Sequence, residues 1–350
     1  MTRRAFPRRF AWRSLYLFLG LSASLFCALP TIQGQSQEPI DTIKIDTNLI
    51  SVPVIVSDRE NRYVRDLKIE AFKLFDNQVE QKIAVFDTGE EPLNVVLMLD
   101  TSLSTSGVLD DIKKAAKAFL KELRPQDRAM IVTFDWQEQK LTTLTSNRKE
   151  LESGIKQAQV GKMAGTVLYD SLMDVSSRVL QPIRGRKAII LLSDGNDHGS
   201  VVTPEDLLRS ESEADAMIYS IYYLPEGLRF LGPPRPMRFP FPRRFDSTTP
   251  QRPRGPGGGQ GGRRGGRRGL GYDGHDLMEK LSEVTGGRFY EGETKNLKET
   301  FALIAEELRH QYRLGFYPDE LKRDGSVHAL SVKVNLPDVS VRSRREYLAK

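Results

Sequence analysis

Between residues 94 and 308 the chain alternates short apolar runs with segments in which apolar residues recur every three to four positions. The continuous apolar runs predict strands that are buried on both faces; they cover 94–99, 128–134, 188–193, 216–223 and 288–290. The periodic segments predict amphipathic helices; they cover 108–123, 147–158, 166–180, a stretch from Thr203 onward, 275–284 and 297–308. Residues 139–145 are expected to add an antiparallel edge strand. Strands that alternate with helices predict an α/β fold, a doubly wound and mostly parallel sheet of the Rossmann-like kind.

Both flanks of this region instead alternate apolar and polar residues with the period of two that is typical of strands. The predicted flanking strands are 49–56, 72–75, 82–86, 312–317, 327–334 and 339–342. Each flank alone is too small for a stable sheet, so we expect the two to pack together as one small β module. The expected organisation is a signal peptide at 1–34, an N-terminal β module at 35–90, an α/β domain at 91–311 with an insertion at 226–274, and C-terminal strands at 312–350.

The first 34 residues have the pattern of an export signal. Five arginines and no acidic residue precede an apolar stretch at 15–29, which Pro30 and a polar segment follow. The stretch is short for a membrane span, although an uncleaved anchor is an alternative. The only cysteine, Cys27, lies within it, so the mature chain would contain no disulfide. The protein is therefore expected to be secreted or periplasmic, with membrane contact only if the signal is retained.

The net charge of +6 is distributed very unevenly along the chain. Residues 1–34 contribute +5 and residues 226–273 contribute +8, so the remainder carries 6 − 5 − 8 = −7. Residues 227–271 hold 12 glycines and 8 prolines, a composition that predicts disorder. The folded part is mildly acidic, which argues against a nucleic-acid-binding fold. The Arg/Gly segment resembles nucleic-acid-binding segments, but behind an export signal it is more consistent with a flexible tether, or with a patch for anionic surface polymers or membrane.

Oxygen-bearing side chains follow two of the predicted strands. Asp100, Ser102 and Ser104 come directly after the run 94–99, Asp194-Gly195 follows the run 188–193, and Thr166 opens a predicted helix. The carboxyl ends of parallel strands meet at one edge of a sheet, and hard oxygen ligands suit a small divalent cation such as Mg²⁺. Taken singly, the serines also fit helix caps and Asp194-Gly195 fits a plain turn.

This set resembles the von Willebrand factor type A (VWA) family, whose metal-ion-dependent adhesion site uses Asp-x-Ser-x-Ser, a distant Thr and a distant Asp followed by Gly. The resemblance covers about residues 92 to 311, and the flanks look like a VWA-related group of exported proteins common in acidobacteria. It implies that Asp100, Ser102, Ser104, Thr166 and Asp194 hold Mg²⁺, Mn²⁺ or Ca²⁺. It also implies that an Asp or Glu carboxylate of a protein ligand completes the coordination, so that the site works in adhesion and not in catalysis.

Signatures of an enzyme are weak. Gly257, Gly259 and Gly262 match a dinucleotide-binding spacing but have no strand before them, and no nucleophile elbow, phosphate-binding loop or zinc-protease motif is present. The sequence therefore predicts an exported interaction module and not an enzyme. The alternatives are an anion or nucleic-acid binder that acts through the Arg/Gly segment, and a metal-dependent hydrolase, which lacks an accompanying general base. His198 follows Asp194 closely enough to lie at the rim of the metal site.

Overall fold

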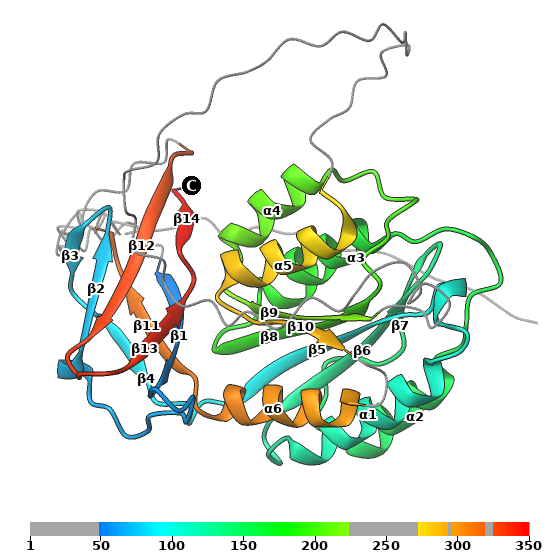
Figure 1. The fold of residues 1–350 in the computed structure, drawn as a ribbon, viewed down its shortest axis with the longest axis horizontal. Coiled ribbons are helices and arrows are strands. Elements are labelled where there is room, and N and C mark those ends of the chain that lie inside the picture. Colours follow the sequence, from blue (N-terminus) through cyan, green and yellow to red (C-terminus); the bar gives the residue numbers. More distant parts are fainter. Residues whose placement is uncertain (1–48, 224–271, 293–295, 319–324, 350) are drawn as a thin grey trace, which may run out of the picture. The chain divides into compact units, whose positions relative to one another are not determined.

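The structure, a computed structural model, describes residues 49–223, 272–292, 296–318 and 325–349 (Figure 1). The predicted signal peptide at 1–34 and most of the insertion at 226–274 lie outside the described residues. The predicted end of that insertion, at residue 274, was wrong, because Gly274 is the first residue of a helix and Asp273 is its N-cap. The last two residues assigned to the insertion therefore belong to the folded domain.

A six-stranded sheet forms the centre of the α/β domain, in the strand order β10-β9-β8-β5-β6-β7. All of its pairings are parallel except that of β7 with β6, which confirms the predicted fold class and the antiparallel edge strand. The strands are β5 (Leu93–Asp100), β6 (Arg128–Phe134), β7 (Glu138–Lys140), β8 (Arg186–Ser193), β9 (Met217–Tyr223) and β10 (Phe289–Gly292). Every residue of β5 and β8 is buried, as expected for central parallel strands.

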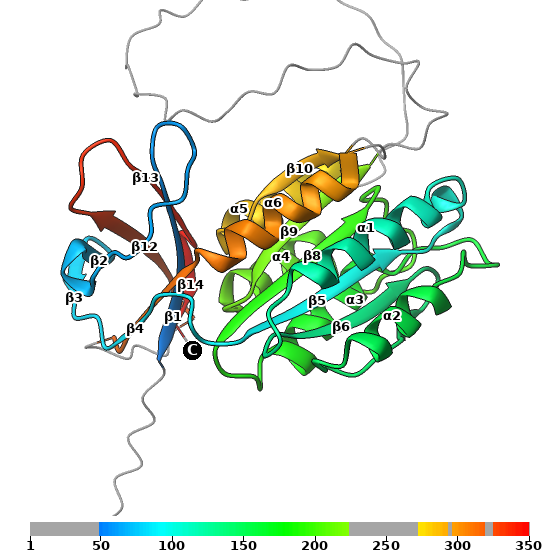
Figure 2. The same ribbon diagram turned by 90° about the horizontal axis from the view of Figure 1, so that it is seen from below.

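Helices cover both faces of this sheet (Figures 1 and 2). Neighbouring residues of a strand point to opposite faces, and those of β5 accordingly pack in two different core clusters. Val95, Leu97 and Leu99 pack in one core cluster with α1, α2 and α6, whereas Val96 and Met98 pack in another with α3, α4 and α5. The helices are α1 (Leu109–Glu122), α2 (Arg148–Gln157), α3 (Leu168–Asp174), α4 (Pro204–Glu213), α5 (Gly274–Thr285) and α6 (Leu297–Arg309). Among the described residues, no helix combines the length and apolar character that crossing a membrane requires.

Two helix starts follow directly from the sequence. Asn147 caps α2, because its side chain accepts hydrogen bonds from the backbone amides of residues 149 and 150. Thr203 caps α4 in the same way, with Pro204 at the first helical position. The helix predicted at 166–180 differs: it begins at Leu168 and continues after Asp174 as a π-helical stretch, Val175–Leu180. Helical periodicity does not distinguish these two helix types.

The flanking strands form two four-stranded antiparallel sheets with a shared core, so the N- and C-terminal strands build one β module as predicted. The first sheet, in the order β13-β1-β11-β4, contains Ser340–Ser343, Ile50–Ser57, Tyr312–Phe316 and Val85–Asp87. The second, in the order β14-β12-β2-β3, contains Glu346–Leu348, Val327–Val334, Phe72–Asp76 and Val79–Gln81. The predicted strand 82–86 was wrong in extent, because the chain leaves one sheet after Gln81 and enters the other at Val85.

A buried ionic cluster joins the β module to the α/β domain at the amino-terminal end of the sheet. Glu307, at the end of α6, has no exposed surface and accepts a hydrogen bond from Tyr219 of β9. It also forms ion pairs with Arg288 and with Arg342 of β13. Burial raises the pKa of Glu307, but the two guanidinium groups outweigh that effect and leave its pKa below the usual value. The carboxyl ends of the strands, at the opposite edge, remain free of the β module.

Glu211 of α4 is a fully buried carboxyl group whose Oε2 accepts a hydrogen bond of 2.7 Å from the Ser176 hydroxyl. Burial raises its pKa from 4.5 to about 8, an effect that the Ser176 hydrogen bond only partly offsets. The group is therefore protonated in the folded protein at neutral pH and ionised in the unfolded chain. Its contribution to stability is complete below pH 4.5 and is lost as the pH rises toward 8.

The Glu211→Gln variant is expected to lose this pH dependence, because an amide remains neutral throughout. Above pH 8 it should exceed the wild type in unfolding free energy by several kcal/mol, on the order of 3. Urea unfolding between pH 5 and 9 measures the difference, and Glu205→Gln, at an exposed position on the same helix, is the control. If the unfolding free energies of Glu211→Gln and the wild type changed in parallel with pH, the raised pKa of Glu211 would be contradicted.

Candidate metal centre

Asp100 is the last residue of β5, a central strand of the sheet that lies between β6 and β8. Its side chain has no exposed surface. One carboxylate oxygen accepts a hydrogen bond from the Ser102 amide (2.8 Å), and the other accepts one from the Ser193 hydroxyl (2.6 Å). Burial raises the pKa of Asp100 to about 6, and the nearby negative charge of Asp194 acts in the same direction. A buried carboxylate in this setting is stabilised by a cation.

Ser102 and Ser104 leave β5 in a tight turn that brings their hydroxyls together, with Oγ atoms 2.9 Å apart. The turn is a 3₁₀ helix, Leu103–Thr105, and the Thr105 hydroxyl donates a hydrogen bond to the Ser102 carbonyl (2.7 Å). Neither serine caps α1, whose N-cap is Val108 and has no side-chain hydrogen bond. The helix-cap explanation for the two serines is therefore wrong for α1.

Thr166 reaches the same edge from the loop between α2 and α3. That loop is held to the turn after β5, because the Gly161 amide donates to the Thr101 carbonyl (2.7 Å). Thr166 itself is buried, and its carbonyl accepts a hydrogen bond from the His198 amide. The exposed His198 is therefore held next to Thr166 through its backbone, and its role at the rim of a metal site stays a prediction.

Asp194 follows β8 and is also buried, with one carboxylate oxygen accepting a hydrogen bond from the Asn196 amide (3.1 Å). Gly195 after it has φ +75° and lies against Gly274, where a Cβ atom on either glycine would come within 3.0 Å of the other backbone. Only glycine fits this contact. It fixes the segment that carries Asp194 against the start of α5.

Two residues near the carboxylates were not predicted as parts of the site. Ser193 donates to Asp100 and accepts from the Gly195 amide (3.0 Å), so its hydroxyl orients Asp100. Tyr223, at the end of β9, is fully buried, and burial together with the charges of Asp100 and Asp194 raises its pKa well above the ordinary value. A serine and a tyrosine at strand ends carry no distinctive sequence signal, and only strand pairing brings them here.

The donor set of this centre is chemically uniform. Asp100 and Asp194 supply carboxylates, and Ser102, Ser104 and Thr166 supply hydroxyls, which are the hard oxygen ligands that Mg²⁺, Mn²⁺ and Ca²⁺ prefer. Two of these segments follow β5 and β8, and the third precedes α3. Backbone hydrogen bonds hold the three segments at one edge of the sheet. Two carboxylates would balance the charge of a bound divalent cation, and five protein ligands would leave one position of an octahedral cation open.

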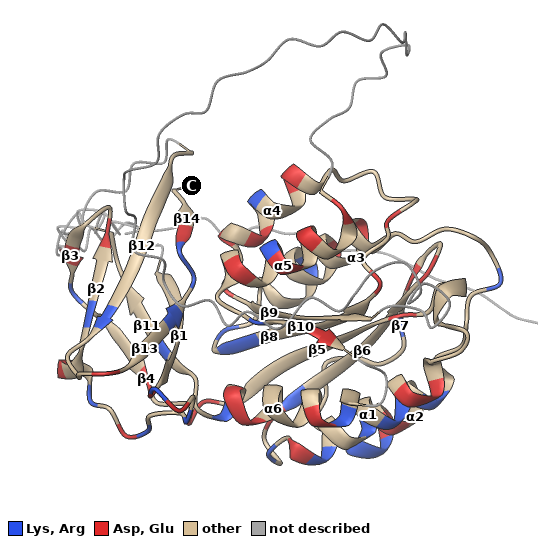
Figure 3. Cartoon of the chain, in the orientation of Figure 1, with Lys and Arg blue, Asp and Glu red and all other residues tan. Residues whose placement is uncertain are grey.

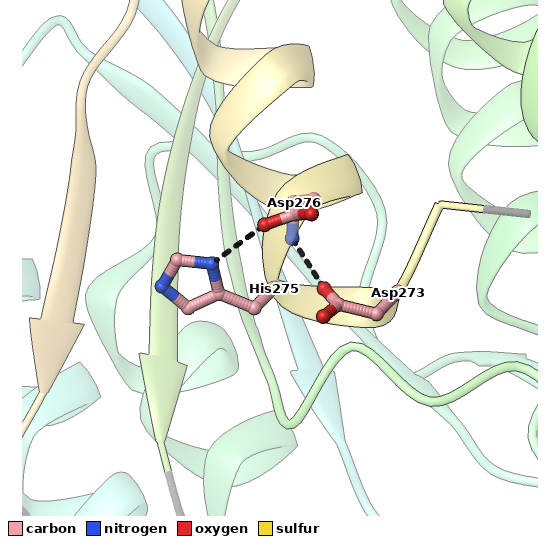
Figure 4. A group of neighbouring side chains, drawn as sticks. All are labelled: Asp273, His275 and Asp276. Atoms are coloured by element: carbon pink, nitrogen blue, oxygen red, sulfur yellow. Dashed lines mark hydrogen bonds and ion pairs between the residues drawn. The ribbon is translucent and has the colours of Figure 1, made fainter. Parts of the chain in front are cut away.

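A second group of ionisable side chains lies at the start of α5. Asp273, His275 and Asp276 place one ligand atom each within 4.8 Å of one another. Figure 4 shows the three side chains together at the start of the helix. His275 already pairs with Asp276 (3.3 Å) and with Glu291 (2.9 Å). Burial lowers its pKa, but these hydrogen bonds outweigh burial and raise the pKa overall. Asp273 caps the helix, so these three side chains stabilise the start of α5.

Acidic and basic residues are interspersed along α1 and α2 (Figure 3). Beside the metal centre, a groove of about 620 Å³ runs between β7 and α3. Its lining includes Trp136, Lys140, Val167, Met173, Arg178 and Val202. The groove mixes apolar and charged side chains of both signs.

Comparison with known families gives one match. Residues 95–196 match the family model of the von Willebrand factor type A domain, and this range contains all five predicted ligands. The predicted resemblance is therefore confirmed for residues 95–196, whereas the ligand set stays a prediction. A comparison with curated proteins finds no match.

Solved structures with detectable similarity include an aerotolerance-related membrane protein from Bacteroides fragilis (16% identity, 62% of this chain and 98% of that chain, TM-score 0.42). Another is proximal thread matrix protein 1 from the mussel byssus with a zinc-occupied MIDAS motif (15% identity, 67% and 50%, TM-score 0.44). A third is the vWF domain of the type V pili tip protein Mfa5 from Porphyromonas gingivalis (13% identity, 61% and 94%, TM-score 0.39).

Proposed function

We propose that the von Willebrand factor type A domain of this chain binds a protein ligand through a divalent cation, which Asp100, Ser102, Ser104, Thr166 and Asp194 hold. The observation that carries this proposal is the environment of Asp100. Its buried carboxylate is oriented by Ser102 and Ser193 at the edge where the two serine hydroxyls lie 2.9 Å apart. A bound Mg²⁺ or Mn²⁺ would supply an open coordination position for an Asp or Glu carboxylate of the ligand.

The protein's own residues prepare this site. Ser193 holds the carboxylate of Asp100 in one orientation, and the close contact of Gly195 with Gly274 fixes the segment that carries Asp194. Both contacts reduce the ordering that metal binding would otherwise require. None of the ligands is paired with a histidine or lysine that would act as a general base, so we propose an interaction module and not an enzyme.

We further propose that the protein works outside the cytoplasm, in the periplasm or after secretion. The support is the predicted signal at residues 1–34, with its five arginines and the apolar stretch that follows. Free divalent cations and surface-exposed protein ligands are both accessible to an exported interaction domain. The Arg/Gly segment within 226–274 would then serve as an additional contact for anionic surface polymers.

A retention experiment tests the proposed function. The full chain is immobilised and exposed to the native envelope fraction with Mn²⁺, with a chelator, or with Mn²⁺ in about 0.5 M salt. We expect the retained ligand to be released by the chelator and to resist salt, because the cation bridges the two proteins at short range. Release by salt alone, without any effect of the chelator, would instead assign binding to the Arg/Gly segment.

A further inference from the structure

Exposed apolar side chains gather around the candidate metal centre. In the described part of the α/β domain, the large apolar side chains that are exposed are Leu103, Trp136, Met163, Val201, Tyr272 and Leu303. Leu303 lies within the α-helix α6 and Leu103 within the 3₁₀ turn after β5, whereas the other four lie in connecting segments. Single exposed apolar residues are normal on a soluble domain, but several together mark an interaction surface.

Three of these side chains flank the proposed hydroxyl ligands. Leu103 stands between Ser102 and Ser104 in the turn after β5 and is 51% exposed. Trp136, in the turn after β6, is 42% exposed and lies next to Gly165, where a Cβ atom would be 3.4 Å from that of Trp136. Gly165 directly precedes Thr166 in the chain. The tryptophan therefore lies at the side of the site that Thr166 forms.

Met163 approaches from the loop between α2 and α3 and is 54% exposed. The same loop is bound to the turn after β5 through the Gly161 amide and the Thr101 carbonyl (2.7 Å). Leu103, Trp136 and Met163 thus come from three separate segments that meet at one edge of the sheet. We call these three residues the apolar rim.

The acidic groups in these loops are turned toward the protein's own backbone. Asp135 is buried and accepts a hydrogen bond from the Gln137 amide. Asp197 accepts from the Tyr169 amide and from Ser200. The exposed charged side chain beside the rim is Lys162, which precedes Met163. With a cation bound, the surface would offer apolar contacts and that cation to an arriving carboxylate, while Asp135 and Asp197 keep hydrogen bonds within the protein.

We propose that the ligand presents an acidic residue with large apolar residues on both sides of it, and that the rim binds these neighbours. This inference rests on the proposed metal-dependent function. The carboxylate would complete the coordination of the cation, while its apolar neighbours cover Leu103, Trp136 and Met163. Trp136 also lines the groove between β7 and α3, so the apolar neighbour on the tryptophan side would lie against the apolar part of that groove, which Val167 and Met173 form.

The rim contains its own spectroscopic reporter. The chain has two tryptophans, Trp12 and Trp136, so the Trp12→Phe variant of the full chain leaves Trp136 as the sole tryptophan. The probes are three blocked peptides with the central sequences Phe-Asp-Leu, Ser-Asp-Ser and Phe-Asn-Leu. Each is titrated in saturating Mn²⁺ and again in chelator, with Trp136 fluorescence as the signal and calorimetry as a second readout.

We expect the Phe-Asp-Leu peptide to bind in Mn²⁺ at least about tenfold more tightly than Ser-Asp-Ser, since two large apolar side chains become buried. Met163→Ser should remove most of this preference. Trp136→Ser should also remove most of it, and calorimetry measures that loss because this variant lacks the fluorescent reporter. Leu303→Ser, which removes an exposed apolar residue on α6, is the matched control and should preserve the preference. Calorimetry with Mn²⁺ alone should give unchanged metal affinity for Met163→Ser.

The remaining outcomes separate the two proposals. Equal affinity for both Asp peptides, unaffected by Met163→Ser, would overturn the rim proposal and leave the metal-dependent function standing. Binding that ignores the chelator, or that is as strong for the Phe-Asn-Leu peptide, would overturn the proposed function itself. The rim proposal would then fail with it.

Discussion

The Asp100→Asn variant is expected to lose Mg²⁺ and Mn²⁺ binding while its metal-free form remains folded. Asparagine keeps an oxygen that accepts from the Ser102 amide, but it removes one of the two charges proposed for the site. Loss of a residue that only orients a ligand reduces metal affinity about 10- to 100-fold, so loss of a charged ligand should exceed about 100-fold. The metal-free fold should tolerate the change, because a neutral amide avoids the cost of burying a charge.

Calorimetric titration of Mn²⁺ and thermal unfolding with and without the cation measure both parts of this prediction. Asp135→Asn is the matched control, because Asp135 follows the neighbouring strand β6, is equally buried, and also accepts a backbone amide two residues on. The control should retain metal-dependent stabilisation. Undiminished Mn²⁺ affinity in Asp100→Asn would remove Asp100 from the site.

Truncation of the chain after His310 is expected to unfold the N-terminal strands as well as remove the C-terminal ones. In the structure β1 lies between β13 and β11, and β2 lies between β12 and β3. The truncation therefore removes both neighbours of β1 and one neighbour of β2. The apolar side chains of Val54, Val56 and Phe72, which are buried in the shared core, would then be exposed to water.

Hydrogen exchange on the truncated protein tests this expectation. Amide protection at residues 49–86 should fall by orders of magnitude, about 100-fold or more, while the central sheet keeps more protection. Arg342→Ala is the comparison variant, because it breaks the ion pair with Glu307 but leaves every strand in place. It should lower global stability without selective loss at 49–86. Full protection of residues 49–86 in the truncated chain would mean that the two flanks fold independently.

Much of the α/β domain was predictable because its signals are local. Buried strands are continuous apolar runs, and the caps at Asn147 and Thr203 are recognisable within a few residues. The turn that brings Ser102 and Ser104 together follows directly from the end of β5. These features depend on side chains that are close in sequence, so the sequence alone determined them.

The environment of the candidate site was decided by tertiary structure. Ser193 donates to Asp100 across 93 residues of sequence, and Tyr223 lies close enough to feel the charge of the same carboxylate only because β9 pairs with β8. The same holds for Glu307 and Arg342, which meet across the junction of two separate cores. Trp136 and Met163 join Leu103 at the rim because loops from different segments converge at one sheet edge. Local periodicity determines which elements form, but the pairing of distant strands determines which side chains meet, and no short sequence pattern encodes that pairing.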